Sequence, residues 1–165
     1  MWRYEKALPL SLAEATTDLQ EGLTPLVGSI WGGRDVRLKL DYMMPTGSFK
    51  DRGTSIVVNY MKKLGIDYVL EDSSGNAGAS IAAYSAAAGL RCDVYVPASA
   101  SAGKLFQIGM YGARLVKIAG SRLDVAHAAL EAAKSAFYAS HNWHPLFLEG
   151  TKTLAYELWE QLGWQ

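Results

Sequence analysis

The sequence has little cysteine, no excess of charge of either sign and no long apolar run. Cys92 is the only cysteine, so the chain can form no internal disulfide, and its strand-like surroundings favour a small core residue. The 16 basic residues balance the 16 acidic ones, and no Lys/Arg cluster marks a surface for nucleic acid or anionic membranes. No uninterrupted apolar run reaches the roughly 18 residues of a membrane-spanning helix, and the N-terminus lacks the apolar stretch of a signal peptide. We therefore expect a cytoplasmic protein that binds neither nucleic acid nor membrane.

What is present is ordinary for a globular protein: 50% of the residues are hydrophobic and 19% are charged. The 165 residues suffice for one domain and part of a second. Up to residue 48 the apolar runs are short, although Val36 to Leu40 alternates as a half-buried strand should. From residue 50 onward, short apolar runs at 68–70, 92–96 and 115–118 alternate with helical segments at 76–88, 102–111 and 122–138. This alternation predicts an α/β fold with an open parallel sheet and flanking helices.

The last segment, Lys152 to Gly163, places three leucines at four-residue spacing, as an amphipathic helix does: Leu154, Leu158 and Leu162. No strand follows this helix, so the architecture looks truncated. We expect the uncovered apolar stripe to promote association, and we expect a homo-oligomer.

A lysine follows a turn in the stretch Pro45-Thr46-Gly47-Ser48-Phe49-Lys50-Asp51-Arg52-Gly53. Ser48 is a competent N-cap, which places Lys50 in the first turn of a helix. The helix dipole is positive there, so it disfavours an ammonium and favours the neutral, nucleophilic amine. The alternative is a solvated lysine whose charge Asp51 offsets.

A second polar loop, Glu71 to Gly78, follows a strand and opens a helix. Its backbone N–H groups and short side chains form a ready site for a carboxylate or phosphate. Gly75 and Gly78 permit a ligand to approach the backbone closely. Alternatively, the loop is an ordinary helix cap.

The two loops together resemble the hallmark motifs of threonine synthases, which are fold-type II pyridoxal-phosphate (PLP) enzymes related to tryptophan synthase β subunits. The motifs are the lysine loop quoted above and Ser73-Ser74-Gly75-Asn76-Ala77-Gly78. Supporting matches are Thr24-Pro25-Leu26, Val96-Pro97, Tyr111-Gly112-Ala113 and Glu149-Gly150-Thr151-Lys152-Thr153. The resemblance covers nearly the whole chain, as the N-terminal part of such an enzyme.

The resemblance implies a role for each loop. Lys50 would be the Schiff-base lysine and the acid–base catalyst, Asn76 would hydrogen-bond the phenolic oxygen of PLP, and Phe49 would pack beside the cofactor or in the core. The α-carboxylate of an amino-acid substrate would lie against the residues of the second loop: Ser73, Ser74, Gly75 and Ala77. The implied domains are 1–54, a segment of the large cofactor domain; 55–145, a small α/β domain; and 146–165, the start of the return to the large domain. We expect no metal ion.

Two departures from the family pattern bear on function. The sequence contains no Gly-rich loop for the cofactor phosphate, which relatives carry in a longer C-terminal half. In addition, Phe147 stands where many threonine synthases have an Arg that helps to bind the phosphate of phosphohomoserine. Another residue would have to bind this phosphate in place of the Arg. Our preferred candidate is Lys104, and His144 is the alternative. The resemblance therefore implies a PLP-dependent lyase that makes threonine from O-phosphohomoserine. A threonine or serine dehydratase-like lyase and an inactive fragment that serves as an interaction module remain alternatives.

Overall fold

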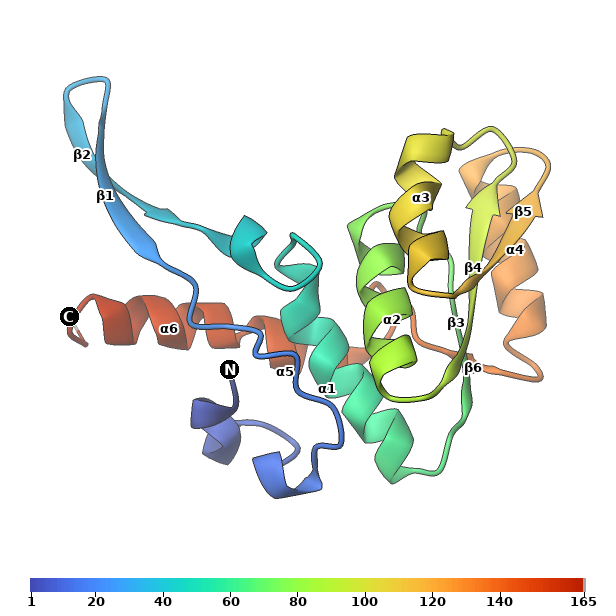
Figure 1. The fold of residues 1–165 in the computed structure, drawn as a ribbon, viewed down its shortest axis with the longest axis horizontal. Helices are drawn as coiled ribbons and strands as arrows, with labels where there is room; N and C mark the ends of the chain where they lie inside the picture. Colours follow the sequence, from blue (N-terminus) through green and yellow to red (C-terminus); the bar gives the residue numbers. More distant parts are fainter. Residues whose placement is uncertain (165) are drawn as a thin grey trace.

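The computed structural model describes residues 1–164, apart from the side chain of Lys104. It contains two separate sheets: helices flank one of them, and the other is a hairpin that projects from the molecule (Figure 1). The strands are β1 (Leu26–Trp31), β2 (Arg34–Lys39), β3 (Tyr68–Glu71), β4 (Arg91–Pro97), β5 (Arg114–Ile118) and β6 (Phe137–Tyr138). The helices are α1 (Lys50–Lys63), α2 (Asn76–Ala87), α3 (Ala102–Met110), α4 (Arg122–Ala132), α5 (Pro145–Thr151) and α6 (Thr153–Gln161), with 3-10 turns at Trp2–Ala7, Leu12–Glu14 and Asp41–Met43.

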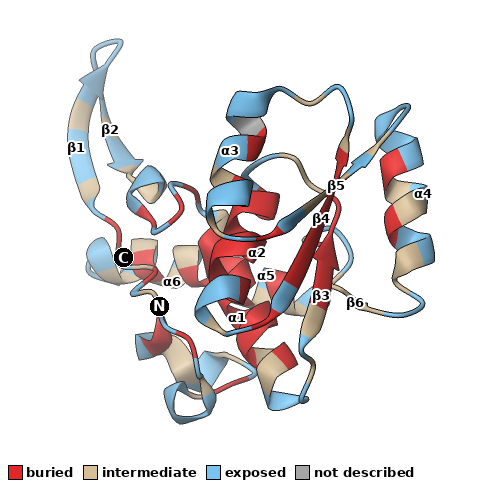
Figure 2. Ribbon diagram, turned by 45° about the vertical axis from the view of Figure 1, so that its right-hand side comes forward, coloured by how far each residue is buried: buried red, intermediate tan, exposed pale blue. Residues whose placement is uncertain are grey.

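The main sheet has the strand order β5-β4-β3-β6, and every pair is parallel. Helices α2 and α4 pack on β4 from opposite faces of this sheet (Figures 1 and 2). The central strands β3 and β4 carry the fully buried positions, as strands covered on both faces must. The predicted α/β fold with an open parallel sheet and flanking helices is confirmed. Cys92 is buried in β4, where burial raises the pKa of its thiol to about 12.

The expectation of one helix over 122–138 is wrong at its C-terminal end. Helix α4 stops at Ala132, and Phe137–Tyr138 forms the edge strand β6 beside β3. The local pattern did not show this pairing, because the partners Val69 and Leu70 are distant in sequence. Since β6 returns to the β3 side of the sheet, the order of strands reverses between β3 and β6. Ligands bind at such reversal points in open α/β sheets.

The other sheet is the antiparallel hairpin β1–β2, which extends away from the rest of the molecule (Figure 1). The strand expected at Val36 to Leu40 exists as β2, but the expectation that it is half-buried is wrong. Only Val36 and Lys39 are even partly covered, and Ile30 and Trp31 near the tip are each 74% exposed. An alternating pattern requires a covering layer to become a buried face, and no described element covers this hairpin.

Helix α1 is the centre of the molecule, between α2 and α5. Its residues from Asp51 to Asn59 are buried, whereas Lys50 at its start is partly exposed. The proposed domain division stays a prediction; α1 passes residue 54 as one uninterrupted helix. The C-terminal amphipathic helix exists as α6, which α5 precedes.

Candidate active site

Lys50 begins α1, as the sequence predicts, but the residue at the N-cap is Phe49 rather than Ser48. The Ser48 hydroxyl oxygen still accepts a hydrogen bond from the Lys50 backbone N–H, at 3.1 Å. Ser48 therefore supports the start of the helix from one position farther out than expected.

Asp51 fixes the lysine loop from inside. Its carboxylate is fully buried and accepts hydrogen bonds from the Thr46 N–H at 2.8 Å and the Thr46 hydroxyl at 2.5 Å. The Ser80 hydroxyl of α2 donates a third, at 2.6 Å. Charge-assisted hydrogen bonds of this kind are strong, so the loop is held in one orientation relative to α2. The proposal that Asp51 merely offsets a solvated lysine does not account for these contacts.

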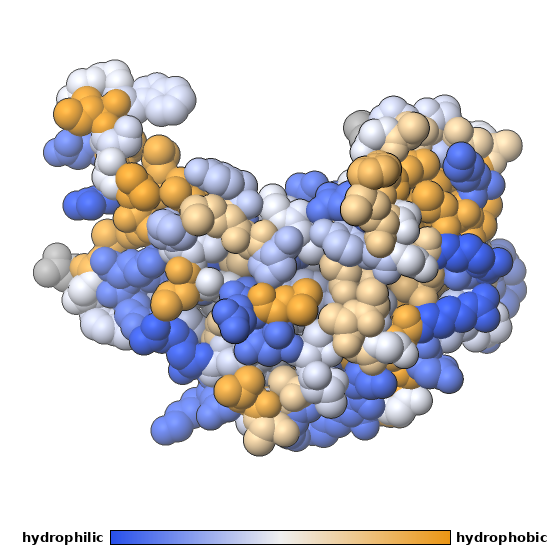
Figure 3. All heavy atoms as spheres, viewed as in Figure 1, coloured by the Kyte–Doolittle hydropathy of each residue, from blue (hydrophilic) through white to orange (hydrophobic). Residues whose placement is uncertain are grey.

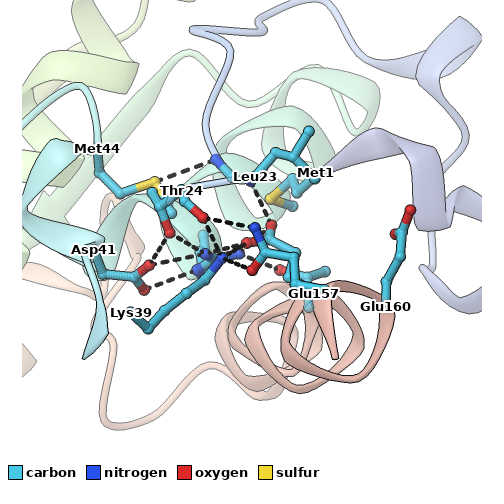
Figure 4. A network of polar contacts seen from close by, with 12 residues as sticks. Met1, Leu23, Thr24, Lys39, Asp41, Met44, Glu157 and Glu160 are labelled. Carbon is cyan, nitrogen blue, oxygen red and sulfur yellow. Dashed lines mark hydrogen bonds and ion pairs between the residues drawn. The ribbon is translucent and has the colours of Figure 1, made fainter. Parts of the chain in front are cut away.

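Arg52, the next residue, also fixes this part of the chain. Its guanidinium is fully buried and donates to both carboxylate oxygens of Glu157 in α6, at 2.6 and 2.7 Å. It also donates to Asp41, at 3.0 and 3.1 Å. Figure 4 shows Thr24, Lys39, Asp41 and Glu157 converging on one network. Asp51 and Arg52, which directly follow the lysine, are thereby tied to α2 and α6.

The Lys50 amine lies against two aromatic rings. Its Nζ is 4.8 Å from the Phe49 ring centroid and 5.4 Å from that of Phe147. Burial lowers the pKa of the Lys50 ammonium, and the charge of Glu71 opposes this shift. The sequence predicted a lowered pKa from the helix dipole, whereas desolvation is the larger cause in the structure. Phe49 is 40% exposed, so its ring is not part of the buried core.

The second loop closes tightly between β3 and α2. Gly75 is the N-cap of α2, and the Ser73 hydroxyl oxygen accepts the Gly75 N–H at 3.3 Å. A Cβ at Gly78 would lie 1.9 Å from the Ser73 carbonyl oxygen, so only glycine fits there. Among the described residues, none accepts a hydrogen bond from the N–H groups of Asn76, Ala77 or Gly78. These free donors suit an anionic ligand.

A hollow of about 270 Å³ opens in front of the second loop. Its lining comprises Ser74, Gly75, Asn76, Ala79, Gly103 and Gln107. The Gln107 amide of α3 donates to the Thr46 carbonyl oxygen at 2.9 Å and thereby joins this wall to the lysine loop. Figure 3 shows a broad notch in the surface between the hairpin and α3. The structure therefore brings the two predicted loops to one open region. Lys104 belongs to α3, beside Gly103, but its side chain lies outside the described part of the structure.

Phe147 and His144 have structural positions that the sequence did not predict. Phe147 is buried, and a Cβ at Gly53 would lie 2.6 Å from its ring, so the ring fills the space over α1. That position offers no solvated place for the Arg expected there. The His144 ring nitrogen accepts the Leu146 N–H at 3.3 Å as the N-cap of α5, and burial lowers the pKa of this imidazole. His144 is therefore a helix cap, and it does not replace that Arg.

Sequence reasoning missed Glu71 and His141, which meet beside the lysine. Glu71 is fully buried at the end of β3, and one of its oxygens lies 3.3 Å from His141 Nδ1. The available signal was an acidic residue directly after the apolar run Tyr68-Val69-Leu70. Burial raises the pKa of Glu71, and a buried carboxyl with a shifted pKa is a candidate functional group.

Three features of the structure fit PLP. The Lys50 amine is partly desolvated and ready to react with an aldehyde, the Asn76 side chain is exposed beside the hollow, and the start of α2 offers free N–H donors. A parallel α/β sheet that presents such a lysine and such a loop defines the fold-type II class of PLP-dependent proteins.

The comparisons with known proteins agree with this class. Residues 17–165 match the family profile described as pyridoxal-phosphate dependent enzyme, and the chain belongs to that family, whose cofactor is the PLP that the sequence predicted. The threonine synthase of Methanocaldococcus jannaschii is 38% identical over 172 residues, which cover 100% of this chain and 42% of that protein. That of Halalkalibacterium halodurans is 38% identical, with 97% and 47% covered. The chain thus spans less than half the length of these relatives.

Solved structures show the same architecture. A PLP-dependent aspartate racemase has a TM-score of 0.76 at 31% identity, with 84% of this chain and 46% of that chain covered. The cysteine synthase of Entamoeba histolytica has a TM-score of 0.79 at 25% identity, with 87% and 48% covered. Across the described residues, every helix is too short or too polar to cross a membrane.

Proposed function

We propose that this chain is the lysine-bearing part of a threonine synthase, which converts O-phosphohomoserine and water to threonine and phosphate. The observation that carries the proposal is the Lys50 amine, held against two rings beside an anion-binding loop. The similarity to proteins named threonine synthase supports the choice of reaction. We also propose a homo-oligomer in the cytoplasm whose ligands are small amino acids.

Each residue has a defined task in this proposal. PLP, when bound, supplies an electron sink for the substrate carbanion. The Lys50 amine would hold the cofactor and would move the proton at the substrate Cα. The Asn76 amide would donate to the phenolic oxygen of PLP, and Phe49 would exclude water from one side. The substrate carboxylate would accept hydrogen bonds from the second loop: Ser73, Ser74, Gly75 and Ala77.

The covalent role of Lys50 can be tested by trapping. PLP-loaded protein is reduced with borohydride, digested and mapped by mass spectrometry. We expect the pyridoxyl group on Lys50 and its complete loss in Lys50→Ala, because this amine has a lowered pKa. Lys62→Ala, on the same helix, is the matched control and should leave the adduct unchanged. A pyridoxyl group on Lys39, Lys62 or Lys104 would contradict the assignment.

The reaction itself can be tested by comparing two released products in the full-length protein. A threonine synthase releases phosphate from phosphohomoserine, whereas a dehydratase releases ammonia from threonine or serine. Because Phe147 is buried and uncharged, we propose Lys104 as the cation that faces the substrate phosphate. Lys104→Ala should then raise KM for phosphohomoserine at least tenfold, and unchanged phosphate release would refute this role.

A further inference from the structure

A buried carboxylate lies where the strand order of the sheet reverses. Glu71 is the last residue of β3, and its side chain has no exposed surface. Burying an ionised carboxylate is costly unless a partner compensates, and the proposed reaction gives this group no task.

The partner of Glu71 comes from the neighbouring edge strand. Because β6 runs parallel to β3, the chain after Tyr138 leads His141 to the end of β3. One Glu71 oxygen accepts the His141 backbone N–H at 3.3 Å, and the other lies 3.3 Å from His141 Nδ1. The His141 ring is mostly covered as well. At this separation the imidazole Nδ1–H can donate to the carboxylate, and this hydrogen bond favours the ionised form of Glu71.

The Phe147 ring lies between the His141 imidazole and the Lys50 amine and contacts both. The His141 and Phe147 rings meet edge to face, with centroids 5.8 Å apart, and Phe147 lies 5.4 Å from Lys50 Nζ. The close approach of Gly53 fixes the Phe147 ring from below. Burial raises the pKa of Glu71, although the hydrogen bond with His141 opposes this, and the Glu71 charge in turn stabilises the Lys50 ammonium.

Other ionisable groups surround Glu71 on each neighbouring element. Asp72 follows it and forms an ion pair with Arg122 of α4 at 2.5 Å, so this second carboxylate is already compensated. The thiol of Cys92 on β4 and the phenol of Tyr138 on β6 stay uncharged near neutral pH, because burial raises the pKa of both. Lys50 is therefore the base near Glu71 whose ammonium the Glu71 charge stabilises.

We propose that Glu71 and His141 form a positioning pair that sets the protonation state of the Lys50 amine from behind the Phe147 ring. This inference rests on the proposed role of Lys50. The pair acts through charge and ring placement, because the hydrogen bond with His141 favours the ionised form of Glu71. An ionised Glu71 holds Lys50 as ammonium, and a protonated Glu71 releases it as the free amine.

The pair can be tested by titrating Lys50 directly in the intact protein without PLP. Trace acetylation with acetic anhydride over a pH series, read by peptide mass spectrometry, gives the pH midpoint of each amine. In Glu71→Gln we expect the Lys50 midpoint to fall by about half a pH unit or more, because the compensating anion is gone. The midpoint of Lys63, at the far end of α1, should not change.

A matched variant and a second substitution sharpen the test. Glu149→Gln removes one negative charge from exposed α5 and should leave the Lys50 midpoint unchanged. His141→Asn should lower the midpoint in the same direction, since it removes the hydrogen bond that keeps Glu71 ionised. Glu71→Gln combined with His141→Asn should shift no further than Glu71→Gln alone. A Lys50 midpoint that Glu71→Gln leaves unchanged would overturn the proposal.

A measurement on the unsubstituted protein covers the case in which a variant does not fold. Nitrogen NMR of the imidazoles should show that His141 Nδ1 is hydrogen-bonded, in contrast to the ring nitrogens of exposed His127. A His141 Nδ1 signal like that of His127 would overturn the pairing. Neither readout uses substrate turnover, so failure here leaves the proposed function intact. Failure of the proposed function would instead appear as cofactor trapped on a different lysine.

Discussion

The loop after β3 closes as it does because residue 78 has no side chain. A methyl group there would overlap the Ser73 carbonyl oxygen, whereas a methyl at Gly75 would meet its nearest neighbour, the Ser73 hydroxyl, at 3.9 Å. Two glycines of one motif thus have different reasons to be present. Gly78 is required by the closure of the chain, and Gly75 is required only if a ligand approaches it.

These two glycines form a matched pair of substitutions. We expect Gly78→Ala to lower the free energy of unfolding by about 2–3 kcal/mol, because the overlap is with rigid backbone. Gly75→Ala should change it by less than about 1 kcal/mol. Urea denaturation followed by circular dichroism measures both. Equal losses for the two variants would show that the Gly78 contact is not what restricts the loop.

At the scale of elements, α1 and α5 cross at unusually short range. A Cβ at Gly150 would lie 2.0 Å from the Arg52 carbonyl oxygen and 2.8 Å from the Gly53 Cα. This crossing places Phe147 of α5 over α1 and thereby forms one wall beside Lys50.

Adding a methyl group at this crossing should therefore push the helices apart. We expect Gly150→Ala to destabilise the protein by about 2–3 kcal/mol and to reduce the yield of pyridoxyl adduct on Lys50. Gly109→Ala in α3 is the control, because its Cβ would meet nothing closer than 3.9 Å. It should gain up to about 1 kcal/mol from helix propensity, as thermal melts can show. If Gly150→Ala left the free energy of unfolding unchanged, the two helices would be able to move apart without destabilising the protein.

The junction of α1 and α6 depends on pH through Glu157. Burial by itself would raise the pKa of this carboxyl, but hydrogen bonds from Arg52 and Lys39 outweigh it and hold the pKa at about 2, against 4.5 in the unfolded chain. A depressed folded pKa contributes stability that is present above pH 4.5 and is lost as the pH falls toward 2.

Glu157→Gln should remove this contribution, which is about 3 kcal/mol at neutral pH. The free energy of unfolding of the variant should then depend less on pH over that acid range than that of the parent. Glu131→Gln, at an exposed ion pair with Lys134, is the control and should follow the parent closely. Parallel pH curves for parent and Glu157→Gln would contradict the buried network.

At the scale of the whole molecule, apolar surface is exposed on the hairpin and along α5 and α6. The hairpin exposes Ile30 and Trp31, and an apolar groove along α5 and α6 contains Leu148, which is 68% exposed, together with Leu154 and Leu158. Figure 3 shows apolar side chains along the hairpin. Exposed patches of this kind mark surfaces that bind protein.

We expect residues 1–165 by themselves to self-associate through the groove along α5 and α6. Leu148→Lys should shift the distribution in sedimentation velocity toward monomer. Leu64→Lys, at an exposed apolar residue after α1, is the matched control and should not. A monodisperse parent, or equal effects of both substitutions, would show that the groove does not drive association.

Sequence alone determined the parts that depend on local periodicity and on contiguous motifs. The alternation of apolar runs and helices specified the α/β sheet, and the two loops specified the family, the cofactor and the placement of Lys50 at a helix start. The apolar periodicity and the two loop motifs each span a short stretch of consecutive residues, so they can be recognised without knowing which distant residues come into contact.

Tertiary structure decided what depends on contacts between distant segments. The edge strand β6 exists because Val69 and Leu70 pair with it, and the hairpin is exposed because no described element covers it. The Phe147 ring packs beside Lys50 and does not occupy a phosphate-binding position, because it lies directly against Gly53. Glu71 and His141 are 70 residues apart and meet only where the strand order reverses. Desolvation and charge act through space, so these properties became visible only once the chain was folded.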